Sequence, residues 1–501
     1  MINSRIIQSS WLKRSLEILP GLASWSALIL PPLLSRPFPA GVVAFVILFD
    51  LYWLYRALIM TTHLILGYRF HRRSMRTDWL AKVQAIPHHR ELYHAIIVAT
   101  YKEDLSILRQ TFQAIANSRY DLKKFIVYLA VEERDKERGL ANARALKQEF
   151  GALFSHFAYT LHPANIPDEV IGKGGNITFA GRELQTYLDQ QKINYERVAV
   201  TTLDADNRVD PLYFSELSYQ FLSHPKPKQV SFQPIPMFFN NIWEAPVYSR
   251  LLAHGTMFWV MIEATRPWRL RNFSSHSQSM AALVEIDFWS TSTIVEDGHQ
   301  YWRSYFAYNG DYSVYPLGTP IYQDAVVGES FFDTLRELYL QRRRWTWGCS
   351  DLPYIITNCL KNTSIPWYEK WGKAFRAFES HFSWATQAVY VMVAGWVPIA
   401  LNASFSDTVL AYNFPQVASR LLTLAMVGLI TAVCVATLLL PPLANRRQQQ
   451  KLLLIEWLLI PIVSPFTSLL FGAIPALDSQ TRLMLGKYLE FRVTKKLPSR
   501  N

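Results

Sequence analysis

The feature that most constrains this chain is the uneven distribution of its apolar residues. Half of the 501 residues are hydrophobic and only 18% are charged, whereas soluble domains carry about 25% charged residues. The apolar residues gather toward the two ends of the chain and leave a mixed, charged middle. A helix of about 20 apolar residues is long enough to cross a bilayer. We therefore expect membrane helices at both ends and a water-facing domain between them.

Two apolar stretches lie near the N-terminus, at 21–34 and roughly 38–67. The first alone is similar to a signal peptide, but the second follows at once, so an uncleaved two-span anchor is expected. Basic residues flank the pair on both sides, which places both flanks in the cytoplasm. Asp50 and Arg56 in the second stretch have two interpretations: snorkelling near the cytoplasmic face, or a polar lining for a transported or lipid-borne substrate.

Three apolar segments follow the central region, at roughly 381–402, 419–441 and 452–477. The loop after the first carries Asp407 and no Lys or Arg, so it is expected outside, whereas the basic run 444–451 is expected in the cytoplasm. A single crossing by the third segment would carry the basic tail outside, against this rule. Pro461 and Pro465 near its middle favour a re-entrant or broken hairpin instead.

The net charge of +12 fits basic loops beside membrane spans, or anionic partners such as phosphates and lipid head groups. Nucleic acid is not expected, because no basic helix or base-stacking module accompanies the charge. The three cysteines, Cys349, Cys359 and Cys434, have no metal-like spacing. They indicate neither a disulfide scaffold nor a zinc site.

The middle of the chain, 90–350, alternates strands and helices. Strands are expected at three apolar runs, 94–101, 124–131 and 197–204. A helix at about 104–118 follows the first run, with Asp104 at its N-cap. The run 229–239 contains prolines, so an edge strand or a bend is expected there. This alternation predicts a doubly wound α/β sheet, whose ligands lie at the carboxyl ends of the strands.

Asp204 and Asp206 lie at the end of one predicted strand. Two carboxylates one residue apart suit a hard divalent cation bound together with phosphates. Such a cation neutralises a pyrophosphate leaving group. A strand-end cap is the competing interpretation, and the triplet alone does not decide between them. Upstream, Lys173 stands in a glycine-rich stretch before a helix. Its spacing is not that of a P-loop, but a lysine at a helix start can contact a phosphate.

Two further motifs carry alternatives. Glu296 and Asp297 open a predicted helix, where they either favour the helix N-terminus or provide, in Asp297, a general base for an acceptor hydroxyl. Gln341, Arg344 and Trp345 share one face of an amphipathic helix. There the arginine can pair with a pyrophosphate and the tryptophan can stack on a sugar, or the helix lies at the membrane surface.

Together these motifs resemble the family 2 glycosyltransferases, on the cellulose-synthase-like and hyaluronan-synthase-like membrane branch. The family pattern runs from the end of the first strand through a lysine–glycine segment, paired aspartates, an acidic pair and a Q-x-x-R-W motif. The corresponding segments here are 100–103, 173–177, 204–206, 296–297 and 341–345. Five motifs in the family's order, flanked by membrane segments, extend the resemblance to nearly the whole chain.

The resemblance implies a GT-A fold, an Mg²⁺ or Mn²⁺ ion, and inversion at the anomeric carbon. It implies that Asp206, with Asp204, binds the metal, that Asp297 is the catalytic base, and that Glu296 and Trp345 serve the acceptor. The residues that it implies for the donor nucleotide are Thr100, Tyr101, Glu103, Glu132, Lys173, Asp204, Gln341 and Arg344.

The tail also resembles the gating loop of cellulose synthases, through Phe491, Val493, Thr494 and Lys496. There are departures from the family pattern. Glu132 and Glu133 stand where an aspartate is usual, which leaves the nucleotide open. The segment 275–278 replaces a G-T-N-like acceptor segment, and His276 within it is either functional or an ordinary polar loop histidine. We expect neither the cyclic-di-GMP-binding domain of the cellulose synthases nor a complete polymer channel.

The resulting hypothesis is an inverting, metal-dependent hexosyltransferase that moves a sugar from a nucleotide sugar, expected to be a UDP-sugar, to a growing polysaccharide. Two alternatives stay open: transfer of one sugar to a lipid-linked acceptor, and a non-catalytic membrane scaffold with a decayed transferase fold. We expect an integral protein of the cell's inner (plasma) membrane, in contact with its lipids, with the catalytic domain in the cytoplasm. The expected parts are an N-terminal two-span region, a GT-A domain, interfacial helices, C-terminal membrane helices and a basic tail, at 1–75, 90–350, 351–380, 381–477 and 478–501.

Overall fold

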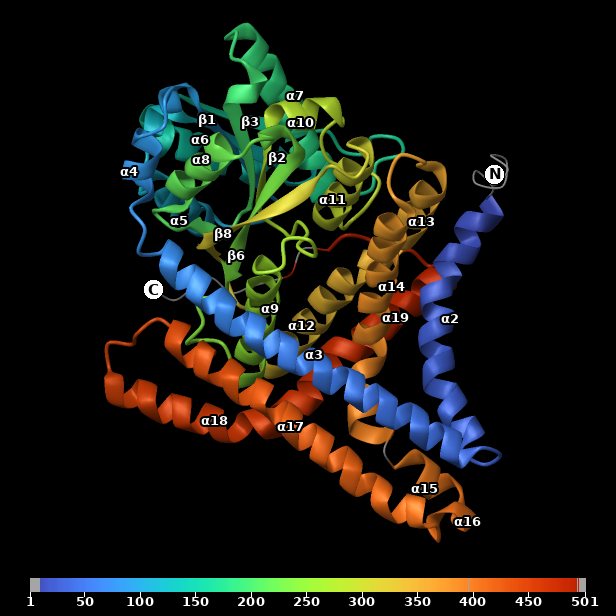
Figure 1. Ribbon diagram of the computed structural model, residues 1–501. Helices are drawn as coiled ribbons and strands as arrows, with labels where there is room; N and C mark the ends of the chain where they lie inside the picture. The colour runs from blue at the N-terminus through green and yellow to red at the C-terminus, as the bar shows by residue number, and fades with distance from the viewer. Residues whose placement is uncertain (1–9, 395, 493, 495–501) are drawn as a thin grey trace. The chain divides into compact units, whose positions relative to one another are not determined.

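A computed structural model describes residues 10–394, 396–492 and 494 (Figure 1). The chain divides into two compact units. The α/β unit comprises Gly67–Ala245, Ala253–Glu329 and the described tail from Glu490. The helical unit comprises the described residues up to Leu66, together with Pro246–Leu252 and Ser330–Leu489. The catalytic domain expected at 90–350 thus corresponds to a unit that ends earlier, at Glu329, and gains the tail.

An eight-stranded sheet forms the centre of the α/β unit, in the order β3-β2-β1-β4-β7-β6-β8-β5 (Figure 1). The strands are β1 Tyr93–Thr100, β2 Phe125–Glu132, β3 His156–His162, β4 Val198–Asp204, β5 Arg208–Val209, β6 Val230–Met237, β7 His276–Ser279 and β8 Ser313–Tyr322. Strands β3, β2, β1 and β4 run parallel, whereas β7 pairs antiparallel with β4 and β6. The predicted α/β class is confirmed, with a mixed sheet in place of a wholly parallel one.

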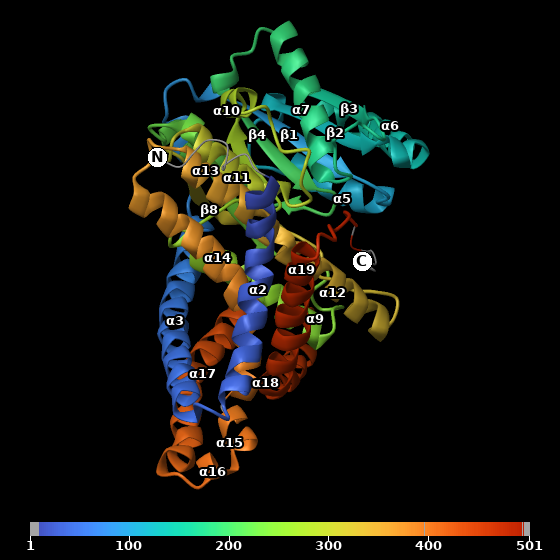
Figure 2. The ribbon, with the colours of Figure 1, turned by 90° about the vertical axis from the view of Figure 1, so that its right-hand side faces the viewer.

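Helices cover both faces of this sheet because alternate residues of each strand point to opposite sides. On one face, Ile96 and Val98 of β1 pack with α5, α6 and α8, and on the other, Ala95 and Ile97 pack with α7 and α10. Figure 2 shows α7 along strands β1 to β3. The helices of this unit are α4 Trp79–Gln84, α5 Leu105–Ala116, α6 Lys136–Phe150, α7 Lys173–Gln190, α8 Tyr213–Ser223, α10 Met280–Glu285 and α11 Glu296–Ala307. Each fully buried Ile or Val contributes about 1.5–3 kcal/mol to folding.

Three local expectations are refined. The proline-containing strand β6 is not at an edge, because it lies between β7 and β8; its register shifts between Gln233 and Ile235, so the bend is what occurs. His276 lies in strand β7 and is 2% exposed, so it is not a loop histidine. Asp104 takes the N-cap position of α5, but its side chain makes no cap hydrogen bond.

The helical unit is built from long helices. Helices α3 Pro39–Ser74 and α9 Val247–Ala264 have residues in both units; the others are α2 Ser10–Leu34, α12 Phe331–Thr346, α13 Leu352–Lys361, α14 Trp367–Val389, α15 Val397–Leu401, α16 Ala403–Ser406, α17 Val409–Leu439, α18 Arg446–Ser468 and α19 Ile474–Met484. Polar contacts join helices that are distant in sequence. Ser24 of α2 donates to Gln480 of α19 over 2.7 Å, and Arg343 of α12 pairs with Asp478 of α19 over 3.0 Å.

Four helical runs of the described chain are long and apolar enough to cross a membrane, and they indicate an integral membrane protein. They are Ser10–Leu34, Pro39–Ser74, Val409–Leu439 and Arg446–Met484. The segment expected as a span at 381–402 falls on the end of α14 and on α15, and it is not among these four. Where a hairpin was expected at 452–477, α18 and α19 form one continuous helical run through a π-helix at Leu469–Ala473.

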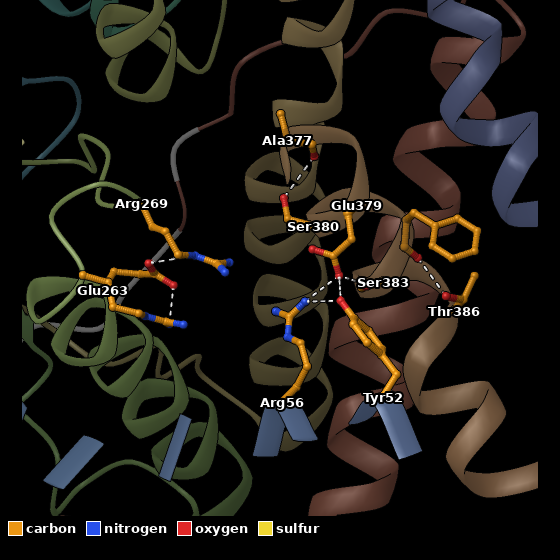
Figure 3. Close-up of polar contacts among 11 residues, drawn as sticks. Tyr52, Arg56, Glu263, Arg269, Ala377, Glu379, Ser380, Ser383 and Thr386 are labelled. Carbon is orange, nitrogen blue, oxygen red and sulfur yellow. Dashed lines mark hydrogen bonds and ion pairs between the residues drawn. The ribbon is translucent and has the colours of Figure 1, made fainter. Parts of the chain in front are cut away.

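A polar cluster lies inside the helical unit around Glu379 of α14 (Figure 3). Its Oε1 atom accepts hydrogen bonds from Arg56 over 2.5 Å, from the Tyr52 hydroxyl over 2.8 Å and from Ser383 over 2.6 Å. The predicted membrane arginine therefore has an ionic partner within its own unit, as is usual for charged side chains in membrane segments.

Candidate functional site

The carboxyl ends of four parallel strands bring the predicted donor residues of the α/β unit to one edge of the sheet. Glu132 at the end of β2 lies opposite His162 of β3. Thr100 of β1 lies opposite Val131, and Ala99 lies opposite Asp204 of β4. Glu132 lies two strands away from Asp204 and two residues farther along the sheet. With about 4.8 Å between strands and about 3.3 Å per residue, their Cα atoms are roughly 12 Å apart.

The turn that carries Asp204 and Asp206 is held by polar contacts from neighbouring elements. Thr111 of α5 donates to the carbonyl of Ala205 over 2.6 Å. The Asp204 N–H donates to the Asn207 side chain over 2.7 Å, and Asn240 donates to the Asp206 carbonyl over 3.1 Å. These contacts fix the backbone of the turn, so both aspartate side chains leave it from defined positions.

Ser274 joins three of the predicted site residues. Its N–H donates to Asp297 Oδ2 over 2.6 Å, its hydroxyl donates to Asp204 Oδ2, and its carbonyl accepts from Lys173 Nζ over 3.2 Å. Lys173 also pairs directly with Asp204 Oδ1 over 2.6 Å. Ser274 has a φ of 20°, a conformation uncommon for a residue other than glycine. The lysine segment, the paired aspartates and the acidic pair therefore meet at one residue.

The N-terminus of α7 approaches α11 closely, because Gly174 has no side chain. A Cβ atom at position 174 would overlap the carbonyl of Ser290 and lie 3.2 Å from Cβ of Glu296. This contact sets Lys173 beside the start of α11. Burial lowers the pKa of Lys173, but the charges of Asp204, Glu296 and Asp297 outweigh it and raise the pKa above its ordinary value, so the lysine is a cation there.

Asp297 lies in the first turn of α11, and both of its carboxylate oxygens accept backbone N–H groups. Oδ1 accepts from Gly298 over 2.7 Å, and Oδ2 accepts from Ser274. Burial raises the pKa of Asp297 and of its neighbour Glu296 above their ordinary values. A carboxylate whose pKa is raised toward neutrality is better suited to accept a proton at physiological pH.

The segment after β1 folds back on Glu103. The Tyr101 N–H donates to Glu103 Oε2 over 2.7 Å, and the Thr100 hydroxyl lies 3.3 Å from the same oxygen. Burial, together with the nearby charge of Asp206, raises the pKa of Glu103 to about 7. Thr100, Tyr101 and Glu103 therefore form one compact group beside the aspartate turn.

The charges at this edge fit a divalent cation. Lys173 pairs with Asp204 and lies near the charges of Glu296 and Asp297, and Glu103 lies near the charge of Asp206. The pKa of three of these carboxyl groups, Glu103, Glu296 and Asp297, is raised. In the described part of the chain, no group of three or more His, Cys, Asp or Glu side chains is arranged to hold a metal by itself. An Mg²⁺ or Mn²⁺ ion bound by one or two aspartates would take its remaining ligands from phosphate oxygens and water, which is the usual arrangement for Mg²⁺.

The remaining predicted residues lie elsewhere in the chain. Gln341, Arg344 and Trp345 are in α12 of the helical unit, where the guanidinium of Arg342 lies 4.8 Å from the centre of the Trp345 ring. In the tail, the ring of Phe491 lies 3.8 Å from the position of a Cβ on Gly172, just before Lys173. Thr494 is described, whereas Val493 and Lys496 fall outside the described residues.

Sequence reasoning missed Ser274 and a second group, His162 with Glu169, which lies beside Glu132. Ser274 directly precedes the segment 275–278, where the chain departs from the family pattern. That departure from the family pattern was the one feature of the sequence that could have drawn attention to Ser274. His162 ends a strand that was not predicted, so its position beside Glu132 had no signal in the sequence.

Comparison with known proteins gives a family match. The model described as "Glycosyl transferase family group 2" matches residues 199–474, more than half of the chain. With the mixed sheet, this match confirms the predicted GT-A fold. No curated protein matches.

Two solved structures are among those similar to the chain. One is the mannosyltransferase PcManGT from Pyrobaculum calidifontis in complex with GDP-Man and Mn²⁺, with 12% identity and a TM-score of 0.46, covering 89% of this chain and 100% of that one. The other is S. aureus TarS 1-349 in complex with UDP-GlcNAc, with 11% identity and a TM-score of 0.36, covering 80% of this chain and 94% of that one.

Proposed function

This chain belongs to the glycosyl transferase family group 2, and from that premise we propose that it is an inverting, metal-dependent hexosyltransferase. The proposed donor is a nucleotide sugar of the UDP type, and the proposed acceptor is a growing polysaccharide. The observation that carries the proposal is the meeting of Lys173, Asp204 and Asp297 at Ser274. Their proximity supports the roles proposed for them: a cation that binds phosphate, a carboxylate that binds the donor, and a base.

The proposed step is a displacement at the anomeric carbon. An acceptor hydroxyl forms the new C–O bond as the bond from the anomeric carbon to the diphosphate breaks, and the nucleoside diphosphate leaves with the bonding electrons. Asp297 accepts the hydroxyl proton, with Gly298 and Ser274 holding its carboxylate in place. Lys173 binds a phosphate oxygen, for which it must release Asp204. Asp206 and Asp204 would hold an Mg²⁺ or Mn²⁺ ion, which would neutralise the charge of the diphosphate.

The other assigned roles remain predictions of the same proposal. Thr100, Tyr101, Glu103 and Glu132 bind the nucleotide, and Glu296 serves the acceptor. Gln341 and Arg344 serve the donor and Trp345 the acceptor. Phe491 beside Gly172 supports a role for the tail at the donor site, and the α/β unit is proposed to face the cytoplasm of the inner (plasma) membrane.

Transfer of a single sugar to a lipid-linked acceptor is the second candidate. It is favoured by the small number of candidate membrane helices, four in the described chain, because extrusion of a polymer needs a lined path through the membrane. The Q-x-x-R-W motif and the tail favour the polysaccharide product.

The deciding experiment uses the full chain purified in detergent. We expect nucleotide release from at least one of a panel of UDP- and GDP-sugars, with activity lost on addition of EDTA and restored by Mn²⁺ or Mg²⁺. Sizing of the labelled product separates a polymer from a single-sugar lipid.

The variant Asp297→Asn tests the base. A general base contributes roughly 10²–10⁴-fold, so we expect a loss of that size in kcat with donor binding retained. Asp311→Asn is the matched control, because Asp311 is exposed and pairs only with Lys226 among the described residues. Unchanged turnover in Asp297→Asn would refute the assignment of the base. Absence of turnover in the unsubstituted protein with every donor would favour the scaffold alternative.

A further inference from the structure

A histidine lies between two carboxylates beside the proposed nucleotide site. His162 Nδ1 is 3.3 Å from Glu132 Oε2, and His162 Nε2 is 2.8 Å from Glu169 Oε1. The second approach is a close charge contact without the alignment of a hydrogen bond. The three side chains are only 8%, 5% and 12% exposed. Two buried carboxylates at these distances favour a protonated imidazole.

The surrounding charges agree with this protonation. Burial lowers the pKa of His162, but its hydrogen bond to Glu132 and the charges of Glu132 and Glu169 outweigh burial and the opposing charge of Arg134, so the pKa is raised. The ring of Phe179 on α7 packs edge-on against the imidazole at 5.7 Å. His162 is therefore a cation held in one position by strand β2, the segment before α7, and α7 itself.

Glu169 occupies space that a glycine leaves free. A Cβ atom at position 175 would overlap Glu169 Oε1. The next residue after Glu169 is also fixed, because the Val170 N–H donates to the Thr291 carbonyl over 2.8 Å. Gly175 belongs to the motif of Lys173, so the group that holds His162 is built into the same turn of helix that presents the lysine.

The two oxygens of Glu132 differ in their partners. Oε2 accepts from Arg134 over 3.0 Å and from His162. Because a carboxylate oxygen has two lone pairs, these two donors occupy Oε2. Among the described residues, Oε1 has no hydrogen-bond partner. Arg134 also lies over the ring of Tyr101, 4.7 Å from its centre, so a guanidinium that contacts the Glu132 carboxylate also contacts an aromatic face.

We propose that His162 determines the choice of nucleotide base, by occupying Oε2 of Glu132 and leaving Oε1 as a single acceptor. Uracil offers one N–H between two carbonyls, which matches one carboxylate oxygen with an arginine beside it. Guanine offers two adjacent N–H donors, which pair best with both oxygens of a carboxylate, as in other bidentate contacts. The site should therefore prefer uridine nucleotides to guanosine nucleotides. This inference rests on the proposed role of Glu132 in binding the nucleotide.

The experiment measures the binding of UDP and of GDP, each with Mn²⁺, to the full chain in detergent by calorimetry. The unsubstituted protein should bind UDP more tightly. In His162→Phe, which keeps a ring against Phe179 but frees a lone pair of Oε2, the ratio of GDP to UDP affinity should rise about tenfold or more, as expected for one hydrogen bond to a charged group. His156→Phe is the matched control, since His156 is in the same strand and stacks on Tyr187 instead.

Two further variants keep the test decisive if His162→Phe fails to fold. Glu169→Gln weakens the hold on His162, and Gly175→Ala displaces the Glu169 carboxylate without changing any charge. Both should shift the ratio in the same direction as His162→Phe, by less. An unchanged ratio in the folded variants would overturn the inference while leaving the proposed function intact. Tighter binding of GDP by the unsubstituted protein would overturn the inference and the UDP-sugar donor, but not the proposed sugar transfer. Failure of the unsubstituted protein to bind either nucleotide would overturn both.

Discussion

At the scale of single residues, Ser274 is the position on which the proposed chemistry most depends. Its main-chain N–H and carbonyl contact Asp297 and Lys173, and its hydroxyl contacts Asp204. The main chain of Ser274 therefore positions Asp297 and Lys173, whereas its side chain positions only Asp204. A substitution that removes the hydroxyl alone separates these two tasks.

We expect Ser274→Ala to weaken donor binding more than turnover. Loss of a hydrogen bond to a charged group is worth about 1.5–3 kcal/mol, so KM for the nucleotide sugar should rise by about tenfold or more while kcat changes little. The measurement is a kcat and KM determination with the active donor. Ser155→Ala, at an exposed serine before β3, is the control. A fall in kcat with KM unchanged would show instead that the hydroxyl acts on Asp297.

The sequence singles out residues whose chemical type suits a donor site, and it misses residues whose proposed role depends on their position in the fold. Asp204, Asp297 and Lys173 are recognisable because carboxylates and a lysine at strand and helix ends suit phosphates and metals. Ser274 is an ordinary serine, and only its contacts in the folded unit distinguish it. The proposed role of His162 likewise depends on the register that places it opposite Glu132. The sequence of one strand does not determine its register with another strand.

At the scale of secondary-structure elements, the junction between α7 and α11 positions the site. Helix α7 begins at Lys173 itself, and Gly174 allows its first turn to reach the Ser290 carbonyl and Glu296. The atom that a methyl group would meet is a backbone oxygen, which moves only with its loop. A methyl group is therefore tolerated less well at Gly174 than at Gly175, where the flexible side chain of Glu169 can move.

We expect Gly174→Ala to destabilise the α/β unit by roughly 1–3 kcal/mol, the usual cost of overpacking, and to reduce activity by displacing Lys173. Thermal unfolding in detergent and nucleotide release measure the two effects. Gly255→Ala in α9 is the control, because no atom lies within 4 Å of its added methyl group and alanine is the better helix former. Equal stability of the two variants would mean that the α7 start is free to shift.

Elements with strong local patterns were predicted, and elements made by long-range pairing were not. The runs for β1, β2 and β4 are rich in apolar residues and were recognised. Strand β7 is the polar sequence HSQS, and it becomes a strand only because β4 and β6 offer hydrogen bonds on both sides. The same pairing places β6 inside the sheet, although its prolines indicated either an edge strand or a bend.

At the scale of the whole molecule, the helices allow two arrangements of membrane crossings. If only the four apolar runs cross, the loop at 402–408 stays on the side of the α/β unit and the basic run 444–451 is carried to the other side. If the chain also crosses between α14 and α15, the loop at 402–408 lies on the opposite side from the α/β unit, and the run 444–451 lies on the same side. Arg446–Met484 then cannot cross completely, because the residues from Glu490 belong to the α/β unit.

The distribution of charge favours the second arrangement. The run 444–451 carries Arg446, Arg447 and Lys451, whereas the loop at 402–408 carries Asp407 and no basic residue, and basic loops are retained in the cytoplasm. We expect Ser404→Cys to react with a membrane-impermeant maleimide in intact cells, and Gln450→Cys to react only after permeabilisation. Cys349, Cys359 and Cys434 are first replaced by serine, and Asp311→Cys reports the side of the α/β unit. Labelling of Gln450→Cys but not Ser404→Cys in intact cells would establish the four-crossing arrangement, and the π-helix at Leu469–Ala473 would then lie within a complete crossing.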